Sequence, residues 1–318
     1  MPAEARRSSL TPADAGISEP RFTYRSTMTE RQAMAWVVAC ALMWSTGGVL
    51  SRFFQTTEGF EVTFWRSVFA ALTVLAWLAL RGERSALRQL RAGAGAVWAS
   101  GLMWAVMFTC FMFSLSLTTV ANVLITQSLA PVFTALLAGR VLRRPVAGRT
   151  WLAIFVAAAG ICLMYVFDVS SLEGRHALGV LVALGIPVAG AINWILLQRA
   201  GTSMDLTSSV LLGAVLSAAL TLPMAWPLGV SLHDLGLLAV LGVFQLGIPC
   251  ILVMRAAARL AAAKTSLLAL LEVVFGIALT WLFGGETPGW ATVAGGLAVL
   301  AALVYNEVGQ SRRPAAAA

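Results

Sequence analysis

The sequence predicts an all-α integral membrane protein in which ten transmembrane helices form two inverted five-helix repeats. Three observations lead to this fold class: the composition, the length of the apolar runs, and a similarity between the two halves of the chain. Of 318 residues, 59% are hydrophobic and only 11% are charged, and the mean hydropathy is +0.84. Soluble domains have roughly a quarter of their residues charged, so this composition is not that of a large soluble domain.

The apolar residues form runs that are long enough for helices crossing a bilayer. A helix needs about 20 apolar residues to span the hydrocarbon, where its backbone groups must bond to one another. The runs are too continuously apolar for the alternating strands of a membrane barrel. We therefore predict ten spans, at residues 33–53, 62–80, 95–115, 119–139, 150–167, 177–197, 207–227, 234–254, 262–283 and 288–306.

The second half of the chain resembles the first. Residues 120–139, VANVLITQSLAPVFTALLAG, align with residues 262–281, AAKTSLLALLEVVFGIALTW, which places Phe133 on Phe275. The two segments are five spans apart, and an odd number of spans turns the second repeat upside down relative to the first. Inverted repeats are typical of secondary transporters, whose binding site lies near the bilayer midplane between the halves.

The basic residues predict the orientation in the membrane. Of the 22 Lys and Arg residues, nineteen fall in the two tails and in alternate loops on one side. Arg52 and Arg175 fall on the other side, and Arg66 lies inside the second span. The positive-inside rule then places both termini in the cytoplasm of a multi-pass bacterial inner-membrane protein. The net charge of +8 therefore reflects topology, and no nucleic-acid partner is expected.

The chain is divided into two repeats and two tails. Residues 1–32 are expected to be a disordered cytoplasmic tail, since they lack the early apolar run of a signal peptide. Residues 33–168 form the first five-helix repeat and residues 177–308 the second. Residues 309–318 form a short cytoplasmic tail at the C-terminus.

Four segments resemble a known transporter family. The first span contains MWST, the second reads FWRSVFAALTVLAWLAL, the fourth carries SLAPVFTALLAG and the ninth carries LLEVVFGIALTWLFGGE. Together they resemble the EamA-repeat permeases of the drug/metabolite transporter superfamily, across residues 33–308. The first span is most similar to that of bacterial exporters of aromatic and other amino acids. The resemblance implies export of small metabolites, amino acids of broad specificity above all, by alternating access.

One departure from the family pattern concerns a helix bend. Family members often carry Glu-Pro in the ninth span, whereas here Glu272 is followed by Val273. The fourth span instead has Pro131, preceded by Ala130. The sequence therefore leaves open whether the ninth helix bends as in its relatives.

Glu272 is the main candidate for coupling transport to proton movement. It lies near the middle of the ninth span, where an ionisable side chain costs free energy and therefore indicates a function or a specific partner. Burial disfavours the charged form of a carboxylate, so Glu272 is suited to load and release a proton; the alternative is a structural clamp between helices. Lys264 is expected to snorkel to the interface. For Arg66, a pair that stabilises the bundle is expected rather than a substrate contact.

Aromatic and polar residues within the spans are the candidates for a substrate cavity. Each has a structural alternative, because Asn and Gln often join helices and aromatic rings often pack or face lipid. Prolines mark candidate hinges or helix breaks, since each frees a backbone carbonyl. The predicted cavity residues are Trp44, Trp104, Phe108, Asn122, Thr126, Asn193, Gln245 and Glu272, and the predicted hinges are Pro131, Pro187 and Pro249.

Two other functions compete with amino acid export. A multidrug or cation exporter could use Glu272 within an aromatic cavity. An intramembrane enzyme would need a nucleophile–base set or metal ligands, but His176 and His233 lie in or near predicted outer loops and the four cysteines lie on four different spans. No catalytic residue, metal or cofactor is expected. The sequence contains no Walker loop, so a gradient, of protons or another solute, must drive transport.

Overall fold

The structure is a computed structural model that describes residues 28–50, 53–55, 59–82, 95–118, 120–143, 146–165, 174–201, 205–284 and 289–311. Within these ranges every regular element is a helix and no strand occurs, which confirms the predicted helical class. Most of the predicted N-terminal tail and the end of the C-terminal tail lie outside the described residues.

The helices follow the predicted spans closely. The first half contains α1 (Glu30–Leu50), α2 (Gly59–Leu80), α4 (Gly95–Leu117), α5 (Val120–Gln127), α6 (Ala130–Val141) and α7 (Gly148–Tyr165). The second half contains α8 (Arg175–Ala183), α9 (Gly185–Ala200), α10 (Thr207–Ala225), α11 (Leu232–Val240), the π-helical segment η2 (Leu241–Gly247), α12 (Ile248–Ala257), α13 (Ala262–Ala269), α14 (Leu271–Gly284) and α15 (Trp290–Ser311).

Seven helical stretches of the described chain are long and apolar enough to cross a membrane. Two further apolar helices, at residues 148–163 and 290–306, are shorter, and α1 is not among the seven. The protein is thus a helical multi-pass membrane protein, while the number of ten spans stays a prediction.

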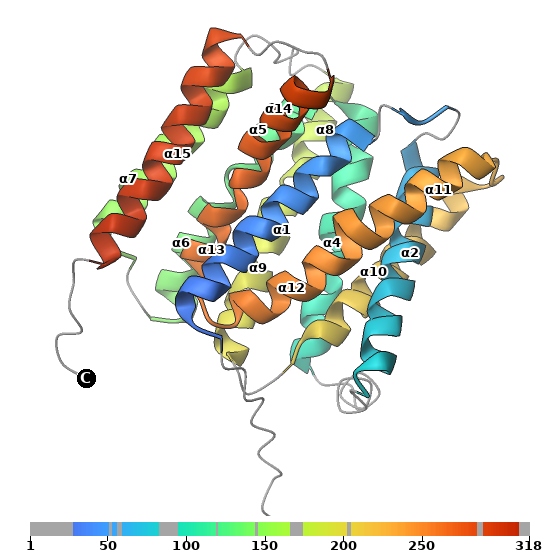
Figure 1. Ribbon diagram of the computed structural model, residues 1–318, viewed down its shortest axis with the longest axis horizontal. Coiled ribbons are helices and arrows are strands. Elements are labelled where there is room, and N and C mark those ends of the chain that lie inside the picture. The colour runs from blue at the N-terminus through green and yellow to red at the C-terminus, as the bar shows by residue number, and fades with distance from the viewer. Residues whose placement is uncertain are drawn as a thin grey trace, which may run out of the picture.

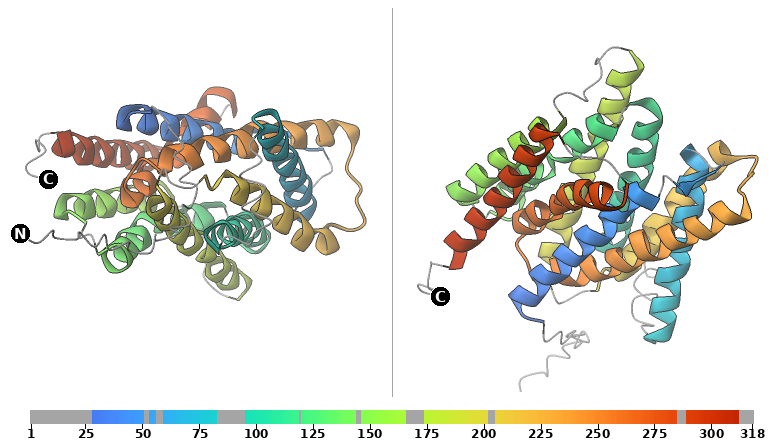
Figure 2. Two further views of the ribbon diagram at one scale, coloured as in Figure 1. Left: turned by 90° about the horizontal axis from the view of Figure 1, so that it is seen from below. Right: turned by 45° about the horizontal axis from the view of Figure 1, so that its top comes forward.

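The helices form a bundle whose two described chain ends lie at the same end. In Figure 1, α1 begins and α15 finishes at the bottom of the view. The helices α7 and α15 pack against each other at one edge of the bundle, and α2 packs with α10 at the other (Figures 1 and 2). A hydrogen bond of 2.9 Å from Thr150 to Asn306 joins α7 to α15. The central helices, among them α1, α4, α9 and α12, therefore surround the middle of the molecule.

Four of the predicted spans are interrupted near their middle. Short breaks separate α5 from α6, α8 from α9 and α13 from α14, and the π-helical η2 lies between α11 and α12. The three predicted hinge prolines, Pro131, Pro187 and Pro249, each lie in the first turn of the helix that follows an interruption. A proline is tolerated there because the first N–H groups of a helix have no intrahelical partner.

The ninth span breaks at Leu270 even though it has no proline. The N–H of Leu270 bonds to the carbonyl of Leu267 at 3.2 Å, three residues back, and Leu129 bonds in the same way to Thr126 at 3.1 Å in the fourth span. Such tighter bonds mark a local departure from the regular α-helix. The absence of Glu-Pro therefore does not keep this helix continuous.

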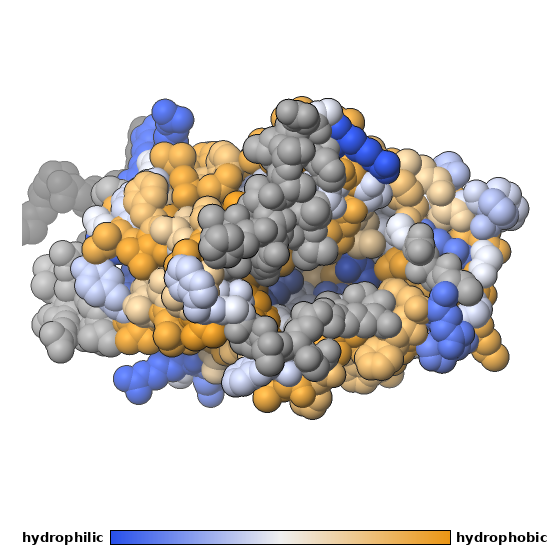
Figure 3. All heavy atoms as spheres, turned by 90° about the horizontal axis from the view of Figure 1, so that it is seen from above, coloured by the Kyte–Doolittle hydropathy of each residue, from blue (hydrophilic) through white to orange (hydrophobic). Residues whose placement is uncertain are grey.

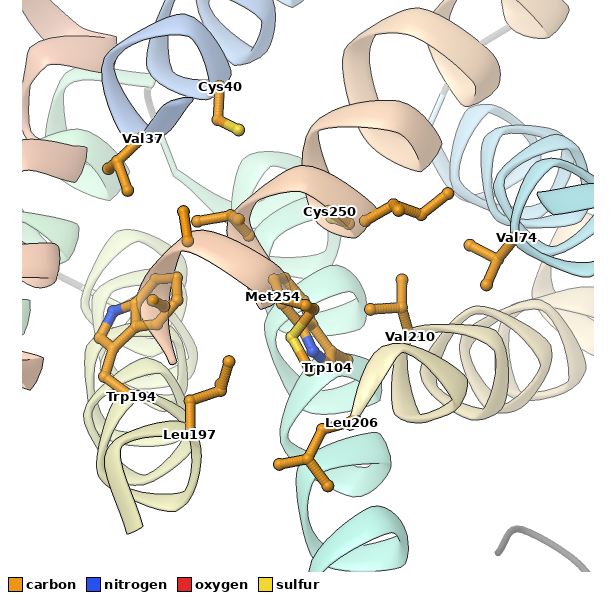
Figure 4. Packing of buried hydrophobic residues seen from close by; sticks show 14 of the residues in the cluster. Val37, Cys40, Val74, Trp104, Trp194, Leu197, Leu206, Val210, Cys250 and Met254 are labelled. Carbon is orange, nitrogen blue, oxygen red and sulfur yellow. The ribbon is translucent and has the colours of Figure 1, made fainter. Parts of the chain in front are cut away.

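The largest buried cluster joins α1, α2, α4, α9, α10 and α12. Figure 4 shows part of this cluster, with Trp104 near Met254 and with Trp194 on the neighbouring α9. The helices α4 and α10 approach so closely that a Cβ at Gly213 would lie 2.3 Å from the Cβ of Trp104. Helices in membranes use small residues for such approaches. This packing fixes the position of Trp104 at the centre of the bundle.

Candidate functional site

A central cavity lies between the two halves of the chain. It has a volume of about 130 Å³. Sites that bind small molecules are mostly apolar with a few polar groups, and the residues that line this cavity follow that pattern. The lining comes from α1, α2, α4, α5, α6, α9, η2, α12, α13 and α14. At the end of the bundle opposite to the chain ends, the surface is hollowed and hydrophilic residues show within the hollow (Figure 3).

Aromatic side chains form one wall of the cavity. Three of the predicted residues, Trp44, Trp104 and Phe108, line it, together with Phe111 and Trp194. The ring of Trp104 lies 5.4 Å from that of Phe108 and 6.5 Å from that of Trp194, which it meets edge-on. Aromatic rings prefer such tilted and edge-to-face contacts. The wall can therefore receive a flat apolar group in the same geometry.

Two opposite charges, Glu272 and Arg66, line this cavity. Glu272 accepts a hydrogen bond from Gln127 of α5, and its charge interacts with that of Arg66. The side chain of Arg66 is buried, and its Nε has no hydrogen-bond partner among the described residues. A cavity with one cation and one carboxylate can bind a ligand that carries both charges.

Sequence reasoning did not find Arg66 as a cavity residue. Its place near one end of the second span favoured a stabilising pair at the rim of the bundle. The structure instead packs α2 against η2, where a Cβ at Gly242 would lie 2.8 Å from the carbonyl oxygen of Arg66. This close approach brings α2 to the cavity. The only signal in the sequence was the ionisable group itself.

Gln245 lines the cavity from the π-helical segment. Its Nε2 donates a hydrogen bond of 3.1 Å to the carbonyl of Trp44 on α1, and its Oε1 is buried without a partner among the described residues. The bond to a carbonyl fixes the amide with its nitrogen toward α1. Single π-helical turns occur frequently at functional sites. The carbonyl oxygen of Gln245 is thus available to a hydrogen-bond donor.

Three predicted cavity residues do not line this cavity. The amide of Asn122 donates to Thr118, which follows the end of α4, at 2.7 Å, and the hydroxyl of Thr126 donates to the carbonyl of Asn122 at 2.7 Å. Asn193 accepts a bond of 2.6 Å from Ser100 and joins α9 to α4. For Asn193 the structure supports the alternative role, a polar contact between helices.

Polar contacts join three helices, α1, α9 and α13, at the end of the bundle that carries the chain ends. The amine of Lys264 is buried and lies 2.8 Å from a carboxylate oxygen of Glu30, which joins α13 to α1. The expectation that Lys264 snorkels to the interface is therefore wrong. Nearby, the N–H of Ala262 donates to the side-chain oxygen of Gln198 at 2.9 Å and joins α13 to α9.

The described residues offer no metal site. No three His, Cys, Asp or Glu side chains among them are placed to share a metal ion. Cys40 and Cys250 are both buried and free, and Cys250 lines the cavity. The donor groups of the cavity are those of an organic ligand site.

Comparison with known proteins agrees with this architecture. The pseudopaline exporter CntI of Pseudomonas aeruginosa is 25% identical over 256 residues, which cover 78% of this chain and 86% of the exporter. The S-adenosylmethionine uptake transporter of Rickettsia prowazekii is 23% identical over 285 residues, which cover 88% of this chain and 94% of that transporter. Human solute carrier family 35 member G1 is 25% identical over 293 residues, which cover 85% of this chain and 77% of the human protein.

The chain also resembles a solved structure and matches a family of transporters. A crystal structure of 17% sequence identity superposes with a TM-score of 0.76, covering 89% of this chain and 99% of the other, and shows the shared fold. The EamA-like transporter family matches residues 31–166 and again residues 177–306. The chain therefore belongs to the EamA-like transporter family, within the drug/metabolite transporter superfamily.

Proposed function

We propose that the protein exports amino acids, with aromatic ones among a broad range, across a bacterial inner membrane. The observation that carries this proposal is the combination of an aromatic wall with one cation and one carboxylate in a single cavity. An amino acid presents a carboxylate, an ammonium group and a side chain. In this proposal Arg66 is the counterpart of the carboxylate, and Glu272 is the counterpart of the ammonium group. The rings around Trp104 are the counterpart of the side chain.

The proposed mechanism is alternating access by two inverted repeats, residues 33–168 and 177–308. Two matches to one family support the repeat, as do the equivalent breaks in the fourth and ninth spans. In this mechanism, the contacts of Lys264 with Glu30 and of Ala262 with Gln198 separate when the cavity opens toward the chain ends. Glu272 is the proposed coupling group, binding a proton and the substrate ammonium in turn.

A multidrug or cation exporter is the second candidate. Glu272 in an aromatic cavity favours it, since a lipophilic cation would gain an ion pair and cation–π contacts. Arg66 in the same cavity opposes it, because like charges repel at short range. An intramembrane enzyme gains no support from the relatives, which are named as transporters.

Transport by the purified protein in proteoliposomes tests the proposed function. Vesicles preloaded with unlabelled phenylalanine should take up labelled phenylalanine, and tryptophan and leucine should compete more strongly than alanine. Tetraphenylphosphonium should compete weakly, because it has no carboxylate for Arg66. Protein-free vesicles are the control. Strong competition by tetraphenylphosphonium, with none by amino acids, would favour the cation exporter instead.

Thiol labelling tests the proposed orientation. In a variant without the four native cysteines, we expect Ala147→Cys, in a basic loop, to resist an impermeant maleimide added to intact cells. Leu232→Cys, which lies at the opposite end of the bundle and is exposed, is the matched control and should react. The positive-inside rule gives this expectation. The reverse labelling pattern would contradict the proposed cytoplasmic position of the two termini.

A further inference from the structure

Arg66 lacks a full set of partners for a buried cation. The residue is 8% exposed, its Nε has no hydrogen bond among the described residues, and it lines the cavity. Glu272 is the carboxylate whose charge acts on it, yet Glu272 is itself bonded to Gln127. Burying a charge is costly unless hydrogen bonds and a counter-charge compensate. The cavity therefore contains a cation with unused hydrogen-bonding capacity.

A second unpartnered group lies in the same cavity and has the opposite character. The Oε1 of Gln245 is an acceptor, whereas the Nε of Arg66 is a donor, and Gln245 is also 8% exposed. The residues belong to η2 and α2, which pack directly against each other. Buried polar atoms are usually paired in native structures. The Nε1 of Trp104 and the Oγ of Ser266, in the same lining, also lack a partner among the described residues, so the four atoms together indicate a site for a polar ligand. That ligand must both accept and donate hydrogen bonds.

We propose that Arg66 binds the carboxylate of the substrate, while Gln245 and Glu272 bind its ammonium group. The guanidinium presents a planar fork of N–H donors that matches a carboxylate in bidentate geometry. An ammonium group has three N–H donors and can bond to a neutral carbonyl oxygen and to a carboxylate at the same time. The inference rests on the proposed function and narrows it: substrates need a free carboxylate as well as an amine.

Three analogues of phenylalanine separate these requirements. Phenethylamine lacks the carboxylate, phenylalanine methyl ester blocks it, and 3-phenylpropionate lacks the ammonium group. Each is used to compete with labelled phenylalanine in the vesicles. Charged hydrogen bonds are the strong ones in proteins, so loss of the carboxylate should weaken competition by about tenfold or more.

Variants of Arg66 test whether this residue makes the distinction. Arg66→Gln should bind phenylalanine about tenfold or more weakly, and phenethylamine should then compete within about threefold of phenylalanine. Arg66→Lys keeps the charge but loses the fork, so an intermediate preference is expected. Arg255→Gln is the matched control, because Arg255 lies outside the cavity, 3.8 Å from Asp205, and its loss should not change the preference.

The outcomes distinguish this inference from the proposed function. If the folded parent exchanges no amino acid, the proposed function is wrong and the inference falls with it. If the parent exchanges phenylalanine but phenethylamine competes equally, only the inference is wrong. It is also overturned if both Arg66 variants elute as folded protein and keep the parent's preference. Should Arg66→Gln fail to fold, the preference of Arg66→Lys decides.

Discussion

Replacing Glu272 with glutamine is expected to abolish accumulation of substrate against its gradient while leaving substrate exchange measurable. A pH gradient of one unit is worth about 1.4 kcal/mol for each coupled proton, which supports about tenfold accumulation. Glutamine keeps the shape and the hydrogen bonding of the side chain but cannot bind and release a proton. The accumulation ratio of Glu272→Gln should therefore fall to about one, measured as labelled phenylalanine in proteoliposomes under an imposed pH gradient.

Two further variants make this result specific. Asp205→Asn removes another carboxylate of the same half, one that lies near Arg255 and outside the cavity, and should leave accumulation unchanged. Glu272→Ala removes the bond to Gln127 as well as the charge. If Glu272 is only a clamp between α14 and α5, the Gln variant should behave like the parent and the Ala variant should lose stability. Full accumulation by a well-folded Gln variant would contradict proton coupling through this residue.

Replacing Gly213 with alanine is expected to lower the stability of the protein by about 1–3 kcal/mol. The added methyl group would lie 2.3 Å from the Cβ of Trp104 and 3.0 Å from the carbonyl oxygen of Gly101. Both obstacles belong to the backbone or to its first side-chain atom, so no rotamer change relieves the overlap. The melting temperature of the detergent-solubilised protein, followed by size-exclusion chromatography, should fall by several degrees.

Transport by Gly213→Ala should also decline, because Trp104 forms part of the cavity wall. Gly236→Ala is the matched control: Gly236 lies in α11, and a Cβ there would meet nothing within 4 Å. Alanine is the better helix former, so this variant should be neutral or slightly stabilised. Equal melting temperatures for the two variants would show that α4 and α10 are not held at this distance.

The helical class, and the candidacy of Glu272 and the aromatic residues for the site, follow from residue types alone. Long apolar runs predict membrane helices. Glu272 can be identified from the sequence because an ionisable group within such a run costs free energy and usually has a function. Prolines predicted three of the four interruptions, since the lost N–H is a property of the residue itself. Trp104 and Phe108 could be placed on one face by helical periodicity.

Other parts of the site depend on which helices face each other, and residue types do not determine that. The sequence offers two roles for Asn193, a cavity contact or a contact between helices, and its partner Ser100 on α4 is seen only when the helices are packed. Arg66 was misplaced for the same reason, because the contact between α2 and η2 determines where its side chain lies. Lys264 was expected near lipid headgroups, and its ion pair with Glu30 joins residues from opposite ends of the sequence.

The break at Leu270 changes the electrostatics around Glu272. In one continuous helix Glu272 would lie mid-way, where the dipoles of neighbouring peptide groups cancel. Because α14 begins at Leu271, Glu272 instead lies in the first turn of a helix. The aligned peptide dipoles of a helix sum to a partial positive charge of about half an elementary unit at its N-terminus. The interruption therefore places Glu272 beside the partial positive charge of the α14 N-terminus and near the opposite partial charge of the α13 C-terminus at Ala269, so the local field depends on how these two helix ends are oriented.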